Sequence, residues 1–208
     1  LMCTFPKSDW NFEKAKGAGR QLGFAGYFNE CMNGFEYQVA GHMIWEGMVQ
    51  EGLAVARAVH DRYHASRRNP WNEVECGDHY ARSMASYGVF LAACGYQYHG
   101  PKGHLAFAPR LTPDDFRAAF TTAEGWGTFS QKRQAQRQTE TIALKWGRLR
   151  LKTLAFALPE NRQPTQISVT LAGKPLTATH ALTGNGVTIS LDSDTILEAG
   201  QSLEISLA

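Results

Sequence analysis

The sequence predicts an α+β fold, in which a helical part is followed by an antiparallel domain that resembles a β-sandwich. Two observations support this prediction. Apolar residues recur at helical spacing in the first half of the chain and with a period of two in the second half. Helices that come first and strands that come afterwards are typical of segregated α and β parts. The helical pattern weakens after residue 112, so we expect domains at residues 1–112 and 113–208.

The composition is that of an ordinary globular protein, with 43% hydrophobic and 19% charged residues. A formal charge of +2 gives no reason to expect nucleic acid or a membrane surface as a partner. No apolar run approaches the roughly 20 residues that a transmembrane helix needs. The four cysteines form no CxxC pair, which favours free thiols and a cytoplasmic location. Because the chain starts at Leu1 and residues 1–34 show no period, we expect a piece of a longer protein.

Three helices are expected before residue 95. Residues 35–63 carry two of them, and residues 78–94 carry the third. Arg57 and Asp61 are four positions apart and are expected to share a solvated face of the second helix. In the third helix small or apolar side chains recur on one face, namely Ala81, Met84, Ala85, Gly88, Val89 and Ala92. Such small side chains allow close helix contacts, as in a barrel of paired helices.

Alternating apolar residues predict the strands of the second half. The alternation changes phase after Gly147 and again before Leu154, which predicts a turn or bulge at each place. A further short strand is expected at residues 104–109. The alternating sets are Ile142/Leu144/Trp146, Leu149/Leu151, Leu154/Phe156/Leu158, Ile167/Val169/Leu171, Val187/Ile189/Leu191 and Leu203/Ile205/Leu207. Turn signals that contain glycine separate the last three sets, which is the pattern of an antiparallel sheet.

The strongest candidate site is the polar segment at residues 72–82, ahead of the third helix. A carboxylate and a guanidinium held together can bind neighbouring sugar hydroxyls, because one accepts hydrogen bonds and the other donates them. Glu73 precedes the helix and Arg82 lies just inside it, so the two can meet near its N-terminal end. The alternative is that Asp78 and Arg82, four positions apart, form an ordinary helical ion pair and the glutamates are solvated.

Other chemistry is weakly indicated. Glu75, Cys76, Asp78 and His79 are metal-ligand types, but their spacing matches no standard zinc or calcium site, so no metal is expected. No phosphate-binding loop, dinucleotide fingerprint, nucleophile elbow or zinc-protease motif occurs, so no cofactor is expected.

Isolated histidines, aromatic residues and basic residues have ordinary structural interpretations. His99 and His104 flank a turn and are expected in loop roles, with Lys102 solvated between them. Trp45, Trp71 and Trp126 can stack on sugar faces, although aromatic side chains more often belong to the core. The basic residues between positions 132 and 152 fit one solvated face of a sheet, not a nucleic-acid interface.

Three blocks of the sequence, at residues 34–53, 67–104 and 107–129, carry a family resemblance. They are similar to the C-terminal part of the catalytic region of glycoside hydrolase family 116, which contains non-lysosomal glucosylceramidases and related β-glucosidases. The block that contains NPWNEVECGDHYARSMAS is the most specific. The resemblance implies that the helices are the last ones of an (α/α)6 barrel. It also implies a retaining mechanism with a glutamate nucleophile and an aspartate acid/base.

In that family both catalytic carboxylates belong to motifs that precede the matched part. No catalytic residue is therefore expected in this chain, and upstream sequence would supply the catalytic pair and the rest of the barrel. The resemblance assigns Glu73 and Arg82 to the hydroxyls of the bound glucosyl unit, with Asp78 and His79 supporting the loop and orienting Arg82. The implied substrate is a β-glucoside or a glucosylated lipid.

One departure from the family pattern makes the sugar preference an open question. Relatives place a tryptophan near the segment at residues 31–37, where this chain has Met32. A different class of function also stays open. The chain can instead be a non-catalytic carbohydrate-binding or interaction module, in which the β-domain is the functional part.

Overall fold

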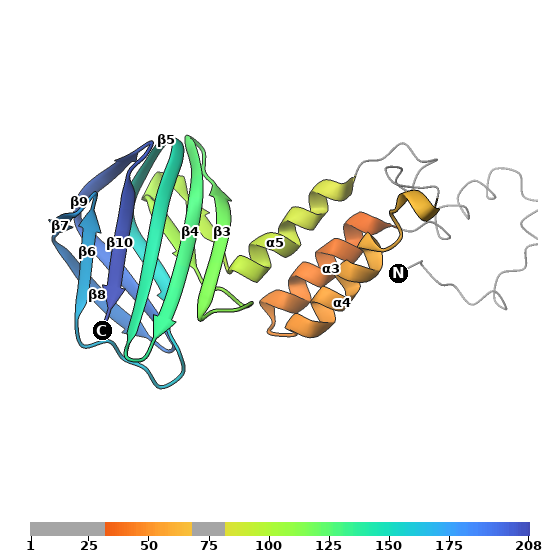
Figure 1. Cartoon of the computed structure of the whole chain (residues 1–208), viewed down its shortest axis with the longest axis horizontal. Helices are drawn as coiled ribbons and strands as arrows, with labels where there is room; N and C mark the ends of the chain where they lie inside the picture. The colour runs from red at the N-terminus through yellow and green to blue at the C-terminus, as the bar shows by residue number, and fades with distance from the viewer. Residues whose placement is uncertain (1–31, 68–81) are drawn as a thin grey trace, which may run out of the picture. The chain divides into compact units, whose positions relative to one another are not determined.

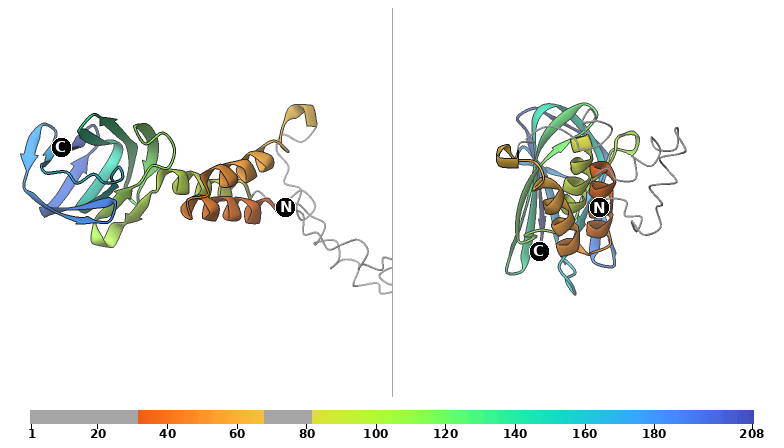
Figure 2. Two further views of the ribbon diagram at one scale, coloured as in Figure 1. Left: turned by 90° about the horizontal axis from the view of Figure 1, so that it is seen from below. Right: turned by 90° about the vertical axis from the view of Figure 1, so that its right-hand side faces the viewer.

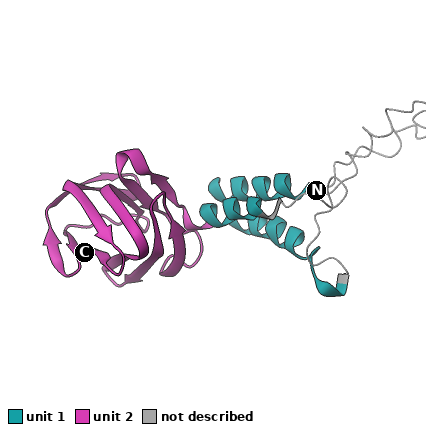
Figure 3. Cartoon of the chain, turned by 90° about the horizontal axis from the view of Figure 1, so that it is seen from above, with its two compact units in different colours: residues 1–92 teal, residues 93–208 magenta. Residues whose placement is uncertain are grey.

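The computed structural model describes residues 32–67 and 82–208 (Figure 1). The chain divides into two compact units, Leu1–Ala92 and Ala93–Ala208 (Figure 3). We refer to them as the helical unit and the β unit. The mixed α+β fold class is confirmed. The described residues contain three α-helices, followed by a large and mostly antiparallel sheet system.

The helical unit contains α3 (Asn33–Trp45), α4 (Val49–His60) and α5 (Ser86–Cys94), whose last residues enter the β unit. Two short 3-10 helices, η1 (Ala65–Arg67) and η2 (Arg82–Ala85), lie between α4 and α5 in sequence. The two helices expected at residues 35–63 are thus present. The (α/α)6 barrel is not established by three helices and stays a proposal.

Small residues bring these helices close together, as the sequence predicts. A Cβ added to Gly52 of α4 would lie 2.6 Å from the carbonyl oxygen of Ala40 in α3. A Cβ added to Gly41 would lie 3.4 Å from the carbonyl oxygen of Gly88 in α5. The buried cluster of this unit consists of Ala40, Ile44, Val89 and Ala92. At these helix–helix contacts the backbones therefore pack closely against each other, with mostly small side chains between them.

Ten strands form the β unit, and its two layers share the long strand β5 (Figures 1 and 2). Their order is β3-β4-β5-β10-β6-β7 in the first sheet and β1-β2-β5-β9-β8 in the second. All pairs are antiparallel except β2 with β5. The strands are β1 (Gln97–His99), β2 (His104–Phe107), β3 (Asp115–Thr121), β4 (Gly125–Gln134), β5 (Arg137–Ala157), β6 (Ile167–Leu171), β7 (Lys174–Leu176), β8 (Ala178–Thr183), β9 (Gly186–Glu198) and β10 (Ser202–Leu207).

Strand β5 passes from one sheet to the other at the place where the apolar alternation changes phase. Gly147 has φ +75° there, a left-handed conformation that favours glycine. The pairing with β9 shifts between Leu151 and Thr153, which is a β-bulge. Both predicted irregularities are therefore confirmed. The side chains that alternate around them are buried, namely Ile142, Leu144, Leu149, Leu151, Leu154 and Phe156.

Trp146 departs from the prediction. The alternation groups it with buried Ile142 and Leu144, yet its side chain is 62% exposed. Its register partner is Trp126 on β4, where the pairing also shifts by one residue. This shift leaves Lys145 without a register partner on β4, so Trp146 faces outward although it still pairs within the first sheet.

Aromatic stacking joins three strands in the interior of the β unit. The rings of Phe107 in β2 and Phe129 in β4 are stacked with centroids 3.8 Å apart. Phe156 of β5, the register partner of Phe107, also lies parallel to Phe129, with centroids 6.0 Å apart. All three side chains are buried. Because each ring comes from a different strand, this stack fixes the second sheet against the first.

Candidate functional site

The structure does not test the sugar-binding pair that the sequence favours. Glu73, Asp78 and His79 lie outside the described residues, and so does the side chain of Arg82. The backbone of Arg82 begins η2, which leads into α5. The roles assigned to these four residues remain predictions.

A hollow of about 460 Å³ lies in the helical unit beside the helix that Arg82 begins. Ala85, the last residue of η2, borders it together with Gly88 of α5. The rest of the lining comes from α3, which contributes two aromatic residues, two polar residues and one glycine. These are Tyr37, Trp45, Gln38, His42 and Gly41. Aromatic faces beside amide and imidazole groups are suited to a sugar, which has both apolar and hydroxyl surfaces.

A buried ion pair ties the start of α3 to the segment after α4. The guanidinium of Arg62 pairs with both carboxylate oxygens of Glu36 and donates to Oδ1 of Asn33 at 2.8 Å. Glu36 is 3% exposed and Asn33 is 1% exposed. Sequence spacing did not reveal this pair, because its members lie 26 positions apart. The contacts assign Glu36 a structural partner within the chain.

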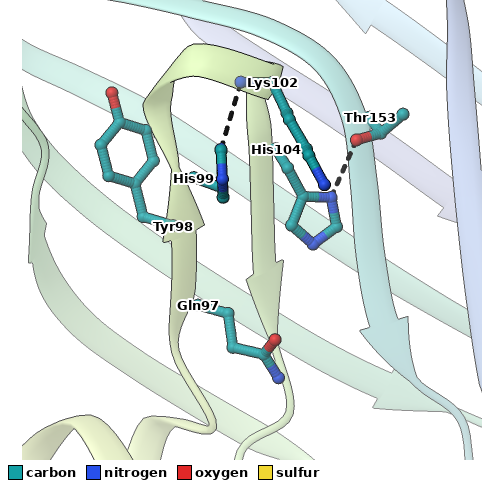
Figure 4. A pocket seen from close by; sticks show the side chains of 6 residues that line it. All are labelled: Gln97, Tyr98, His99, Lys102, His104 and Thr153. Carbon is teal, nitrogen blue, oxygen red and sulfur yellow. Dashed lines mark hydrogen bonds between the residues drawn. The ribbon is translucent and has the colours of Figure 1, made fainter.

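The β unit carries a second hollow, of about 540 Å³, on the outer side of its second sheet (Figure 4). It is lined by Gln97, Tyr98, His99, Lys102, His104 and Thr153. The sequence predicted separate loop roles for the two histidines and a solvated Lys102. Strand pairing instead brings these residues together, since His99 is the register partner of His104, and His104 is that of Thr153.

Hydrogen bonds hold both imidazole rings in place. Nδ1 of His99 accepts from the backbone N–H of Lys102 at 3.3 Å, across the short 3-10 helix η3 (Gly100–Lys102). Nδ1 of His104 lies 2.8 Å from the hydroxyl oxygen of Thr153. Burial lowers the pKa of His104, and the nearby His99 and Lys102 lower it further. The hollow therefore brings together two imidazoles and one ammonium group, and burial disfavours the charged form of His104.

Other reactive groups are few within the described ranges. Burial raises the pKa of the Cys94 thiol to about 11, so this cysteine is a poor nucleophile near neutral pH. Within the described residues, no group of three or more histidine, cysteine, aspartate or glutamate side chains is placed so that it could hold a metal ion. None of the helices described is long and apolar enough to cross a membrane.

Comparisons with known proteins give partial matches only. No family model matches the chain, and no curated protein matches it. Among solved structures, an α-L-rhamnosidase from Dictyoglumus thermophilum matches 67% of this chain and 16% of its own, at 10% identity and TM-score 0.36. A protein described as a glycoside hydrolase matches 60% of this chain and 18% of its own, at 16% identity and TM-score 0.33.

A GH127 beta-L-arabinofuranosidase from Geobacillus stearothermophilus T6 matches 70% of this chain and 22% of its own, at 10% identity and TM-score 0.36. The chain thus spans less than a quarter of the length of each of these three proteins. Their names describe a rhamnosidase, a glycoside hydrolase and an arabinofuranosidase. At these scores the matches do not establish a shared fold or a shared activity.

Proposed function

We propose that this chain contains the C-terminal part of the catalytic region of a retaining β-glycosidase of the family 116 type. The activity would be hydrolysis of β-glucosides, including glucosylated lipids. The observation that carries the proposal is the sequence block at residues 67–104, with its run NPWNEVECGDHYARSMAS. The low-scoring structural matches are not needed for it.

In this proposal Glu73 and Arg82 bind the hydroxyls of the glucosyl unit, and Asp78 and His79 support the loop. Retaining glycosidases use two carboxyl groups about 5–5.5 Å apart. The resemblance places both in motifs outside these 208 residues. The residues of this chain would then orient the sugar for that pair.

The test is the substitution Arg82→Ala in the enzyme that the complete reading frame encodes. Loss of a charged hydrogen bond to the sugar should lower kcat/KM on an aryl β-glucoside by about 10-fold to 100-fold. Arg57→Ala is the matched control, because Arg57 is exposed on α4 and should leave kcat/KM unchanged. An unchanged kcat/KM in the Arg82 variant would refute its role.

A second candidate function, a carbohydrate-binding module, is favoured by one surface feature of the β unit. Trp126 and Trp146 are register partners on β4 and β5, with exposed fractions of 50% and 62%. Paired aromatic rings on a sheet surface can stack on the apolar faces of sugars.

Titration of the isotope-labelled chain with cellobiose separates the two candidates. Amide shifts confined to β4 and β5 around these tryptophans would support a binding module. Shifts in η2 and α5 would support the glycosidase site.

A further inference from the structure

The hollow on the second sheet is lined by basic side chains, whereas an ordinary solvated surface mixes basic and acidic ones. Its lining contains two imidazoles and one ammonium, from His99, Lys102 and His104, and no carboxylate. Figure 4 shows these side chains on neighbouring segments around one opening. In the part of the chain that the structure describes, none of the three forms an ion pair with a carboxylate.

The turn that presents Lys102 is held firmly by strand β5. The carbonyl oxygen of Gly103 accepts from the backbone N–H groups of Lys152 and Thr153, at 2.7 and 3.1 Å. Arg150 donates to the carbonyl oxygens of Gly100 and Pro101, at 3.0 and 2.7 Å. A turn fixed in this way loses little conformational entropy when a ligand binds to it.

The two rings are also oriented. Because Nδ1 of His99 accepts a hydrogen bond, neutral His99 carries its proton on Nε2 and can donate to a ligand from there. His104 uses Nδ1 for Thr153, which leaves Nε2 for other contacts. The remaining lining groups, the amide of Gln97 and the ring of Tyr98, suit a polar ligand larger than a single ion.

Neighbouring charges do not neutralise the hollow. Arg150 pairs with Asp194 of β9 at 2.8 Å, which satisfies that carboxylate outside the lining. Nζ of Lys152 donates to the backbone carbonyl of Asp192 at 2.8 Å. The neighbouring groups whose charge acts on His104 are His99 and Lys102, and both act as positive charges. An anion would relieve the unfavourable proximity of His104 and Lys102.

We propose that this hollow binds the oxyanion group of a small ligand, through donors from His99, Lys102 and His104. Phosphate esters, sulfate esters and sugar acids share the chemistry that these donors recognise. The site is independent of the glycosidase proposal, since it belongs to the β unit alone.

The test is a titration of the isotope-labelled chain, followed by the ring signals of the histidines. The ligands are inorganic phosphate, glucose 6-phosphate, glucuronate and neutral glucose, at constant ionic strength set by chloride. We expect saturable shifts at His99 and His104 with the charged ligands and none with glucose. Tighter binding of glucose 6-phosphate than of free phosphate would show that the ligand is a sugar that carries the oxyanion. The reverse order would show that the ligand is the free ion.

Variants make the test specific. Lys102→Gln and His104→Gln should each weaken binding of the best ligand about tenfold or more, because each removes a charge-assisted donor. Lys174→Gln on β7 is the matched control and should bind unchanged, since it lies in the other sheet. Affinity for glucuronate should also rise as pH falls through the pKa of His104, which lies below the ordinary value of 6.5 because of burial and the nearby His99 and Lys102.

Three outcomes would overturn the proposal. One is the absence of saturable shifts with any of the charged ligands. Another is an equal response to neutral glucose, which would show a site for sugar hydroxyls instead of an oxyanion. The last is unchanged binding in both variants, which would show general ionic attraction.

Discussion

The amide nitrogen of Gln138 donates a hydrogen bond to the carboxyl group of Glu140, at 2.7 Å, inside the β unit. Both side chains are completely buried on the inner face of β5. Across the pair, Arg133 of β4 donates to the amide oxygen of Gln138 at 2.9 Å. No described residue donates to the second carboxyl oxygen of Glu140. Burial therefore raises its pKa to about 7, although Gln138 and the charge of Arg133 partly oppose the rise.

We predict that Glu140 makes the stability of the protein depend on pH. Its folded-state pKa of about 7 lies above the ordinary value of 4.5, so the folded state binds more protons between these two pH values. The free energy of unfolding should therefore fall as pH rises through this window, by about 3 kcal/mol from this group. Urea unfolding at pH 5 and pH 8 measures the change.

Glu140→Gln should abolish this contribution, because glutamine stays neutral at both pH values. The exposed Glu204→Gln on β10 is the matched control and should keep the wild-type pH dependence. Equal pH dependence in the wild type and in Glu140→Gln would contradict the prediction.

Gly147→Ala should destabilise the β unit by about 3 kcal/mol or more. A side chain there would strain a backbone with φ +75° and would overlap the carbonyl oxygen of Glu124. Gly173→Ala separates these two effects. Gly173 has φ +79° but no atom within 4 Å of an added Cβ, so its cost should be about 1–2 kcal/mol. Thermal unfolding of both variants checks the difference, and equal costs would show that the overlap is relieved without penalty.

Arg62→Ala should destabilise the helical unit by about 3 kcal/mol, because it leaves the buried carboxylate of Glu36 without its guanidinium. Amide hydrogen exchange in α3, measured in the full chain, reports on this unit. Arg57→Ala is the matched control, since Arg57 and Asp61 form an exposed pair at 2.6 Å. That variant should change stability by less than about 0.5 kcal/mol. Faster exchange in the control than in Arg62→Ala would be inconsistent with the prediction.

The 208-residue chain by itself should not hydrolyse aryl β-glucosides. The reason is that the family resemblance assigns both catalytic carboxylates to motifs outside this sequence. A release assay with 4-nitrophenyl β-glucoside and the purified chain provides the measurement. Turnover above the buffer rate that survives repurification would show that a carboxylate of this chain takes part in the chemistry.

The alternating pattern predicted β2, β5, β6, β9 and β10, but β1, β3, β4, β7 and β8 could not be predicted. The inner face of β4 carries Gly125, Gly127, Phe129 and Gln131, and only one of these is a large apolar residue. The apolar Trp126 lies on the outer face, so the period of two does not appear in the sequence. Gln131 is tolerated in the interior because its amide donates to the carbonyl oxygen of Pro113 at 2.7 Å.

The candidate sites differ in how far the sequence could indicate them. The polar segment before α5 was visible because its charged residues are close together in sequence, although its geometry lies outside the described residues. The hollow of the β unit was not visible, because His104 and Thr153 are 49 positions apart. Nothing local distinguishes these histidines from ordinary loop residues.

The sequence alone determined that helices precede strands, that Arg57 and Asp61 share an exposed helix face, and that β5 has two irregularities. These features depend on spacing within a single element, where side chains three, four or two positions apart must share a face. Only the tertiary structure decided that Glu36 is paired with Arg62, that Trp146 is exposed, and that the two histidines line one hollow with Thr153. Those relationships depend on which strands and helices become neighbours, and backbone pairing and burial fix that choice over the whole chain.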